Sequence, residues 1–179
     1  MADADPTVTD SSGNGSNSGS FQGGVTPGQP GAVVGDSAVT LDGSTGYITS
    51  DQTFSAPTDF TESVWFKTTT VRGGVLLAQT SGQTGAAGTS DRLLAMDNNG
   101  NIAFGVGRTA IRNQGPAWND GRWHQATATY DSSTATGTLY VDGWLQMATV
   151  FTRIPAALAP SYLRAGYADT SGIQLVFGR

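Results

Sequence analysis

The stretch from Trp118 to Met147 constrains the fold most strongly, because it contains two strands together with their turns. Residues alternate from Trp123 to Tyr130 with a period of two, which predicts a β-strand. One face of it carries His124, Ala126, Ala128 and Tyr130, and the other carries Trp123, Gln125, Thr127 and Thr129. Gly137–Val141 is the next predicted strand. Asp142-Gly143 tolerates positive φ at both central turn positions, so the chain can reverse there into Trp144. The stretch predicts a β-meander.

Four motifs follow one another along the chain in a fixed order. They are DSSGNG (Asp10–Gly15), AVTLDGSTGYI (Ala38–Ile48), FTESVWFKT (Phe60–Thr68), and the set DGRWH, TYD and LYVDG within residues 120–143. Together they resemble the laminin-G-like, concanavalin-A-like jelly-roll family. The resemblance implies an all-β fold, an antiparallel jelly-roll sandwich of two sheets. It says much less about function, because this fold hosts lectins, glycosidases, adhesion modules and virion parts.

The domain division follows from composition and from the resemblance. Residues 1–37 are rich in Gly and Ser, and we expect an irregular opening segment packed on a sandwich formed by residues 38–179. The family usually has one strand before the opening loop and another at the end. Neither is visible here, so the usual first and last strands are expected to be missing. An open sheet edge predicts self-association or strand sharing with a neighbouring chain.

Charge and composition exclude several classes of protein. The formal net charge is −5, so binding to a nucleic-acid backbone is not expected. The chain has no cysteine, which excludes disulfides and thiolate metal sites. No stretch approaches 18 consecutive apolar residues, the length of a spanning helix, so membrane insertion is not expected.

The remaining strands are predicted from local patterns. They are Phe60–Lys67, Val75–Gln79, Leu93–Met96, Ile102–Val106, Val150–Ile154, Tyr162–Tyr167 and Ile173–Phe177. Phe60–Lys67 has apolar residues on both faces, which predicts a central strand covered on both sides. The resemblance to the family assigns Trp65 and Trp123 to packing, because both match its core positions. The loop Thr80–Ser90 is long enough to be a functional rim loop.

Catalysis is not expected. A glycosidase on this fold needs two carboxylates across the scissile bond, yet the chain has one Glu, Glu62, which we expect to face solvent or lie near a sheet edge. His124 is the only histidine, and no nucleophile-elbow motif accompanies it, so a structural role beside Trp123 is expected. Glycoside hydrolysis therefore ranks third among the possible functions.

Calcium is the one metal that the sequence suggests. Asp and Asn oxygens suit it, and relatives on this fold often hold an ion. The candidate ligands are Asp10 and Asn14 in the opening loop, with Asp42 third. The alternative is that these side chains only satisfy their own backbone in Asx-turns. The tetrad Asp97–Gly100 resembles half of an EF-hand loop, but turn chemistry is the preferred explanation.

Ligand binding is assigned to aromatic side chains beside turns. Trp118 and Trp144 are expected to be partly exposed, with Arg112 and Asn113 as partners for sugar hydroxyls. We therefore expect a non-catalytic recognition module that binds a glycan or a surface protein, located outside the cell or on its surface, or on a virion. The alternative is a structural bacteriophage protein of tail or capsid decoration that acts through protein–protein contacts.

Overall fold

The computed structural model describes residues 7–13 and 17–170 of the 179-residue chain. In these residues no helix is present, and hence none long and apolar enough to cross a membrane. The regular structure consists of strands, which confirms the all-β prediction. Their bounds are β1 Thr7–Val8, β2 Gly19–Gln22, β3 Val25–Pro30, β4 Ser37–Leu41, β5 Tyr47–Ser50, β6 Phe60–Lys67, β7 Gly74–Thr80, β8 Ser90–Met96, β9 Ile102–Val106, β10 Thr109–Arg112, β11 Trp123–Asp131, β12 Thr136–Val141, β13 Trp144–Val150 and β14 Tyr162–Ala165.

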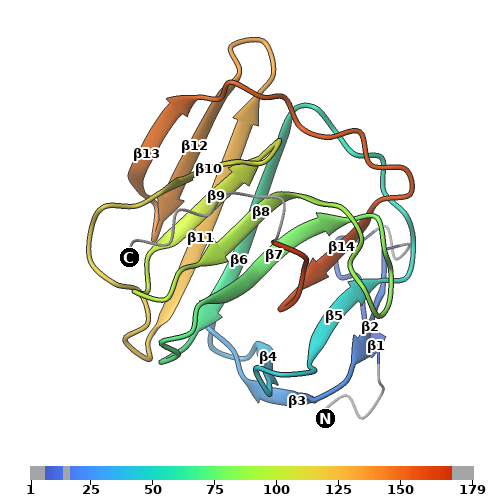
Figure 1. Ribbon diagram of the computed structural model, residues 1–179. Helices are drawn as coiled ribbons and strands as arrows, with labels where there is room; N and C mark the ends of the chain where they lie inside the picture. The colour runs from blue at the N-terminus through green and yellow to red at the C-terminus, as the bar shows by residue number, and fades with distance from the viewer. Residues whose placement is uncertain (1–6, 14–16, 171–179) are drawn as a thin grey trace.

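Two antiparallel sheets pack face to face (Figure 1). The larger has eight strands in the order β1-β2-β5-β14-β7-β8-β9-β10, and the smaller has four in the order β13-β12-β11-β6. The hairpin β3–β4 stands apart from both at one end of the molecule (Figure 1). This arrangement confirms the two-sheet sandwich.

The core lies between the two sheets and follows the predicted alternation. On β11 the four inward residues are all buried, and they are the ones placed on one face by the sequence pattern: His124, Ala126, Ala128 and Tyr130. The ring of Phe104 on β9 packs edge-on against Phe60 and Phe151, with centroid distances of 6.0 and 5.7 Å. Gly137 on β12 lies beneath the Phe151 ring, where any side chain would collide with it.

A second apolar cluster lies on the opposite side of the eight-stranded sheet. Leu93 and Ala95 of β8 belong to it, whereas their neighbours Leu94 and Met96 point into the main core. Ala87, from the loop between β7 and β8, covers part of this cluster. The long loop that the sequence suggested as a functional rim therefore contributes to packing.

Arg164 of β14 fixes that loop. Its side chain is completely buried, and its guanidinium donates hydrogen bonds to the carbonyl oxygens of Gly85 and Ala86 at 3.1 and 3.4 Å. The guanidinium carbon also lies 4.7 Å from the centroid of the Tyr47 ring, close enough for a cation–π interaction. Burial lowers the pKa of Arg164 from its ordinary value.

Several predictions about strands are corrected or fall outside the described residues. Phe60–Lys67 is the edge strand β6, not a central one, because it pairs only with β11. Val150–Ile154 is not a strand: β13 ends at Val150, and the chain leaves the sheet as Phe151 turns its ring into the core. Ile173–Phe177 lies outside the described residues. The described part of the opening segment is more regular than expected, since β2 pairs with β5 in the large sheet.

Candidate functional site

The four-stranded sheet turns one side to the core and the other to solvent, and we call the solvent side the outer face. Its residues are Thr61, Ser63, Trp65 and Lys67 of β6, Trp123, Gln125, Thr127, Thr129 and Asp131 of β11, Thr136, Thr138 and Tyr140 of β12, and Leu145, Ala148 and Val150 of β13. None of these fifteen residues is buried, so no other part of the described chain covers the face. An antiparallel sheet commonly has one solvated side of this kind.

The pairing register fixes which side chains are neighbours on the outer face. Trp65 lies opposite Gln125, and Thr127 lies opposite Tyr140. The hydroxyls of Ser63 and Thr127 are 2.9 Å apart and share a hydrogen bond across the strands. Directly opposed residues on one face have Cβ atoms about 5 Å apart, so the indole and the Gln125 amide form one continuous surface.

Trp65 is 47% exposed, which corrects its assignment to packing. The cause is the position of β6 at the sheet edge, which depends on pairing with a distant strand. A local signal was present, because the residues that share its face, Thr61, Ser63 and Lys67, are polar. Trp123 is also on the outer face, half-buried and opposite Lys67. The outer face thus presents two indoles that sequence reasoning had assigned to the core.

Trp118 is not an open platform. It is half-buried, packs against the main core and places its ring 4.9 Å from that of His124 in an edge-on arrangement. Its indole nitrogen is buried without a hydrogen-bond partner in the described structure. The expected ligand partners lie in the same region: the Arg112 guanidinium, 38% exposed, donates to the Asp97 carboxylate at 3.3 Å.

Asn113 is not available to a ligand. It is 1% exposed, its amide oxygen accepts a hydrogen bond from the backbone N–H of Ile102 at 2.6 Å, and its amide nitrogen donates to the carbonyl of Pro116 at 3.2 Å. The side chain replaces a missing backbone partner beside β9. The four expected ligand residues therefore do not form one site.

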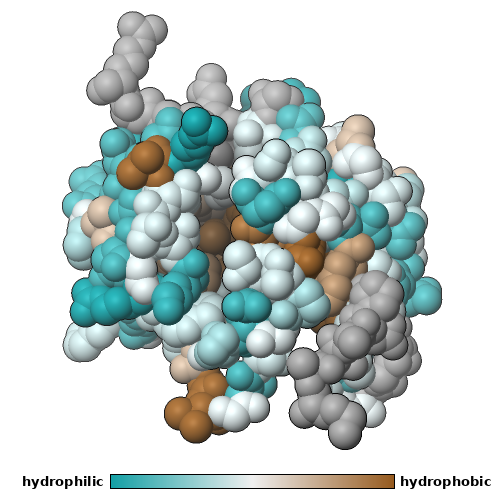
Figure 2. All heavy atoms as spheres, turned by 90° about the horizontal axis from the view of Figure 1, so that it is seen from below, coloured by the Kyte–Doolittle hydropathy of each residue, from teal (hydrophilic) through white to brown (hydrophobic). Residues whose placement is uncertain are grey.

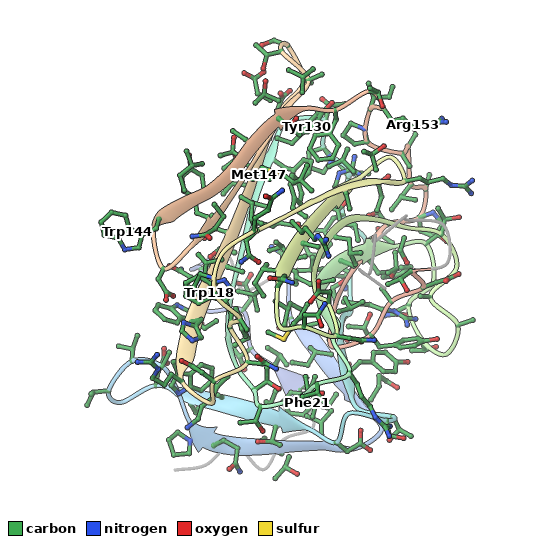
Figure 3. The ribbon with its side chains drawn as sticks, turned by 60° about the vertical axis from the view of Figure 1, so that its left-hand side comes forward. Phe21, Trp118, Tyr130, Trp144, Met147 and Arg153 are labelled. Carbon is green, nitrogen blue, oxygen red and sulfur yellow. The ribbon has the colours of Figure 1, made fainter. Side chains whose placement is uncertain are left out.

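Trp144 is 76% exposed, in agreement with the expectation, and it projects away from the sandwich, whereas Tyr130 lies between the sheets (Figure 3). Asp142 and Gly143, with φ of 52° and 77°, form the predicted tight turn that places it there. Trp144 lies opposite Val141, an inward-facing residue, so it extends beyond the core at the hairpin tip and is not part of the outer face.

His124 joins two turns beneath the outer face. Its Nδ1 lies 2.8 Å from Asp142 Oδ2, and its Nε2 lies 3.0 Å from Asp120 Oδ1. Burial of the ring lowers its pKa, but hydrogen bonds and charges from the two carboxylates raise it more, so the net pKa of His124 is above its ordinary value. As an imidazolium the ring donates to both carboxylates. Its aromatic neighbours are Trp118 and Phe66, not the expected Trp123.

Glu62 lies on the edge strand β6, in agreement with one of its two expected positions, but its side chain points into the sandwich and does not face solvent. Its Oε1 is buried with no hydrogen-bond partner in the described structure. Burial raises the pKa of Glu62 well above its ordinary value, and nearby Arg92 opposes this only in part. Arg92 is itself buried and donates to the carbonyl oxygens of Pro57 and Ala156. An acid held in the core does not contact a substrate bound at the surface.

Among the described residues, no group of three or more His, Asp or Glu side chains is suited to a metal. Asp42 accepts hydrogen bonds from the backbone N–H groups of Ser44, Thr45 and Gly46, at 2.8–2.9 Å. These bonds, led by the one from Ser44, hold the pKa of Asp42 well below its usual range. Its carboxylate stabilises its own turn.

In the opening loop, Asp10 accepts hydrogen bonds from the backbone N–H groups of Ser12 and Asn17 at 2.8 and 3.2 Å. Asn14 lies outside the described residues. Asp97 likewise accepts from the backbone of Asn99 and Asn101, as turn chemistry predicted. Calcium binding stays a prediction.

The view from below shows a hollow with hydrophobic residues at its floor and hydrophilic residues around it (Figure 2). One hollow in the described structure is lined by the side chains of Arg72, Val75, Met96, Tyr167 and Thr170, among others. Tyr167 is the one aromatic residue in that lining. The hollow therefore lacks the two indoles that the outer face has, and the outer face is the stronger candidate for recognition.

Solved structures with the same fold resemble this chain at low sequence identity. The binding domain of Paraclostridial Mosquitocidal Protein 1 superposes with a TM-score of 0.59 at 15% identity, covering 94% of this chain and 48% of that one. The CBM40 of Ruminococcus gnavus IT-sialidase, bound to α2,3-sialyllactose, gives a TM-score of 0.49 at 19% identity over 66% of this chain and 68% of that one. Carbohydrate-binding module CBM66 from Bacillus subtilis gives 0.42 at 14% over 81% and 89%. At 15% identity the likeness to the mosquitocidal protein's binding domain shows the fold alone.

A search of curated proteins gave no match. A family model described as the concanavalin A-like lectin/glucanases superfamily matches residues 42–174, about three quarters of the chain. The match covers most of the motifs quoted above, from Asp42 to Gly143. The chain therefore belongs to the concanavalin A-like lectin/glucanases superfamily.

Proposed function

We propose that the protein is a non-catalytic glycan-recognition module whose binding surface is the outer face. The observation that carries the proposal is Trp65, a half-exposed indole on a rigid strand, directly opposite the amide of Gln125. An indole offers a flat apolar surface to a sugar ring, and neighbouring polar groups bind its hydroxyls. Membership of a superfamily named for its lectins and glucanases supports this function.

The side-chain chemistry supports binding in preference to hydrolysis. Hydrolysis of a glycosidic bond needs two carboxyl groups on either side of the bond. The outer face has one carboxylate on its strands, Asp131 at the end of β11, and Glu62 is held in the core behind the face. Asp131 accepts hydrogen bonds from the backbone N–H and the hydroxyl of Ser133, and it lies six residues along β11 from Gln125, which is opposite Trp65. A sugar bound at Trp65 would therefore meet no pair of carboxyl groups.

A second candidate is contact with another protein through β13. This is the edge strand of the small sheet, and it exposes Trp144, Leu145 and Val150 at 76, 60 and 66%. Exposed apolar side chains along an open edge favour protein–protein contact. The structural virion role stays a prediction, as does a location outside the cell.

The test is a glycan array probed with the fluorescently labelled protein, followed by calorimetry with the best ligand. Trp65→Ala removes the indole from an exposed edge position, so the protein should still fold, and its affinity should fall at least tenfold. Trp144→Ala is the matched control, since it removes a more exposed indole that is not on the outer face, and it should bind like the wild type.

Two results would contradict the proposal. No binding to any glycan, with both variants folded by circular dichroism, would leave contact through β13 as the better reading. Loss of binding in Trp144→Ala with full affinity in Trp65→Ala would keep glycan recognition but move its site to the hairpin tip.

A further inference from the structure

We infer that the ligand is an uncharged glycan longer than one sugar ring, which lies across the strands from β6 to β12. The inference rests on the proposed function and adds to it the chemical class and the direction of the ligand. Three properties of the outer face carry it: its charge, the spacing of its aromatic residues and its unused hydrogen-bonding groups.

Charge is the first property. Of the fifteen residues on the outer face, only Lys67 and Asp131 are charged, with opposite signs, although the whole chain carries 9 basic and 14 acidic residues. A sulfated or polyuronic chain requires several cations along its length, because affinity for a polyanion grows with the number of ion pairs formed. Arg122, which lies beside the face, is already paired with Asp120 at 2.6 Å. The face is therefore suited to an uncharged chain.

Spacing is the second property. Trp65 lies on β6 and Tyr140 on β12, with β11 between them. Trp65 is opposite Gln125 and Tyr140 is opposite Thr127, so two strand spacings and two residues along β11 separate them, about 12 Å, farther apart than the two sides of one sugar ring. A ligand that contacts both rings must therefore be an oligosaccharide, and its chain must run obliquely across the strands. Leu145, opposite Tyr140 on β13, extends the same path by one more strand.

Unused hydrogen-bonding groups are the third property. In the described structure the side-chain amide of Gln125 and the hydroxyl of Tyr140 form no hydrogen bond with the protein, and both lie on this path. An amide both donates and accepts, and so does a phenol, which matches sugar hydroxyls better than a charged group. Ser63 and Thr127, joined by their own hydrogen bond, lie between the two.

The experiment is affinity electrophoresis of the wild-type protein through gels that contain neutral polysaccharides (glucan, mannan, xylan, galactan) or acidic ones (polygalacturonate, heparin), at low and high salt. We expect retardation by at least one neutral polymer, unchanged by salt, and none by the acidic ones. Calorimetry with oligosaccharides of increasing length should then show at least a tenfold gain in affinity from one ring to three.

Matched variants test the path. Tyr140→Ala should remove most of the gain with length but leave the weak binding of a single ring at Trp65. Gln125→Ala should weaken every ligand. Thr136→Ala, on the same face but away from the path, should have no effect.

The outcomes separate this inference from the proposed function. Salt-sensitive retardation by heparin or polygalacturonate alone would overturn the uncharged ligand but keep glycan recognition. Equal affinity for one and three rings would overturn the extended path. Retardation by no polymer of either class would refute both.

Discussion

The pairing of His124 with two carboxylates predicts that the protein loses stability as the pH rises. In the folded state the pKa of His124 is raised, whereas in the unfolded chain it is near 6.5. Below the unfolded pKa the ring is protonated in both states and its stabilising contribution is complete. Between the two pKa values only the unfolded ring releases its proton, so the free energy of unfolding falls as the pH rises, by at most about 1.4 kcal/mol per pH unit.

The size of the loss follows from the geometry. A neutral imidazole has one N–H, so one of the two carboxylates, at 2.8 or 3.0 Å, then faces a nitrogen lone pair. A hydrogen bond to a charged group contributes about 1.5–3 kcal/mol. Asp120 and Asp142 have side chains that are 32 and 35% exposed, so solvent screening favours the lower end, about 1–1.5 kcal/mol in total.

The assay is urea unfolding of the wild type and of His124→Gln at several pH values from about 6 to 9, the range that brackets the ordinary histidine pKa. The wild type should lose stability over this range, and the variant should show a much flatter profile. Because the chain has one histidine, its imidazole resonances give the folded pKa directly by NMR. Parallel profiles for the two proteins, or a folded pKa at or below 6.5, would refute the reasoning.

Three further predictions concern packing and buried charge. Arg164→Met should loosen residues 81–89, because the loop loses both guanidinium hydrogen bonds. Hydrogen exchange of the loop amides should speed up at least tenfold, while the amides of β11 stay protected. Glu62→Gln should be more stable than the wild type by a larger margin at pH 7 than at pH 4. The raised pKa of Glu62 means that the wild type loses stability as the pH rises above about 4.5, whereas the uncharged Gln does not titrate. The same difference in urea midpoint between the two proteins at both pH values would contradict this. Gly137→Ala should cost about 1–3 kcal/mol by forcing a methyl group into the Phe151 ring, whereas Gly115→Ala, which meets only ordinary contacts, should leave the thermal midpoint almost unchanged.

Local patterns predicted the elements whose partners are close in sequence. The meander from β11 to β13 was found because its alternation and its Asp-Gly turn both lie within about thirty residues of chain. Strict alternation on β11 also predicted which residues share the buried face. The two-sheet architecture was predicted from the order of the four family motifs. Local patterns could not predict the order of strands in the large sheet, because it depends on pairings between distant segments, such as β14 with β5.

Side chains whose environment depends on distant strands were not predicted. Trp65 was assigned to packing because it matches a family core position, but its side chain is on the outer face of the edge strand β6 and is exposed. Asn113 appeared to be a free loop amide, but the loop folds back so that its oxygen meets the N–H of Ile102. Glu62 was expected to face solvent or to lie near a sheet edge; it lies on the edge strand β6 but points inward, and the nearby Arg92 that partly offsets the cost of burying the carboxyl lies thirty residues away.

The strict alternation of β11 and β12 separates two kinds of evolutionary change. Odd-numbered residues of β11, such as Gln125 and Thr127, contact solvent, while the even-numbered ones hold the sandwich together. Substitutions at every second position can therefore alter what the surface recognises at almost no cost in stability, and they can be combined freely. A library randomised at these outer positions should yield mostly folded proteins, so the small sheet is a ready scaffold for engineering new specificities.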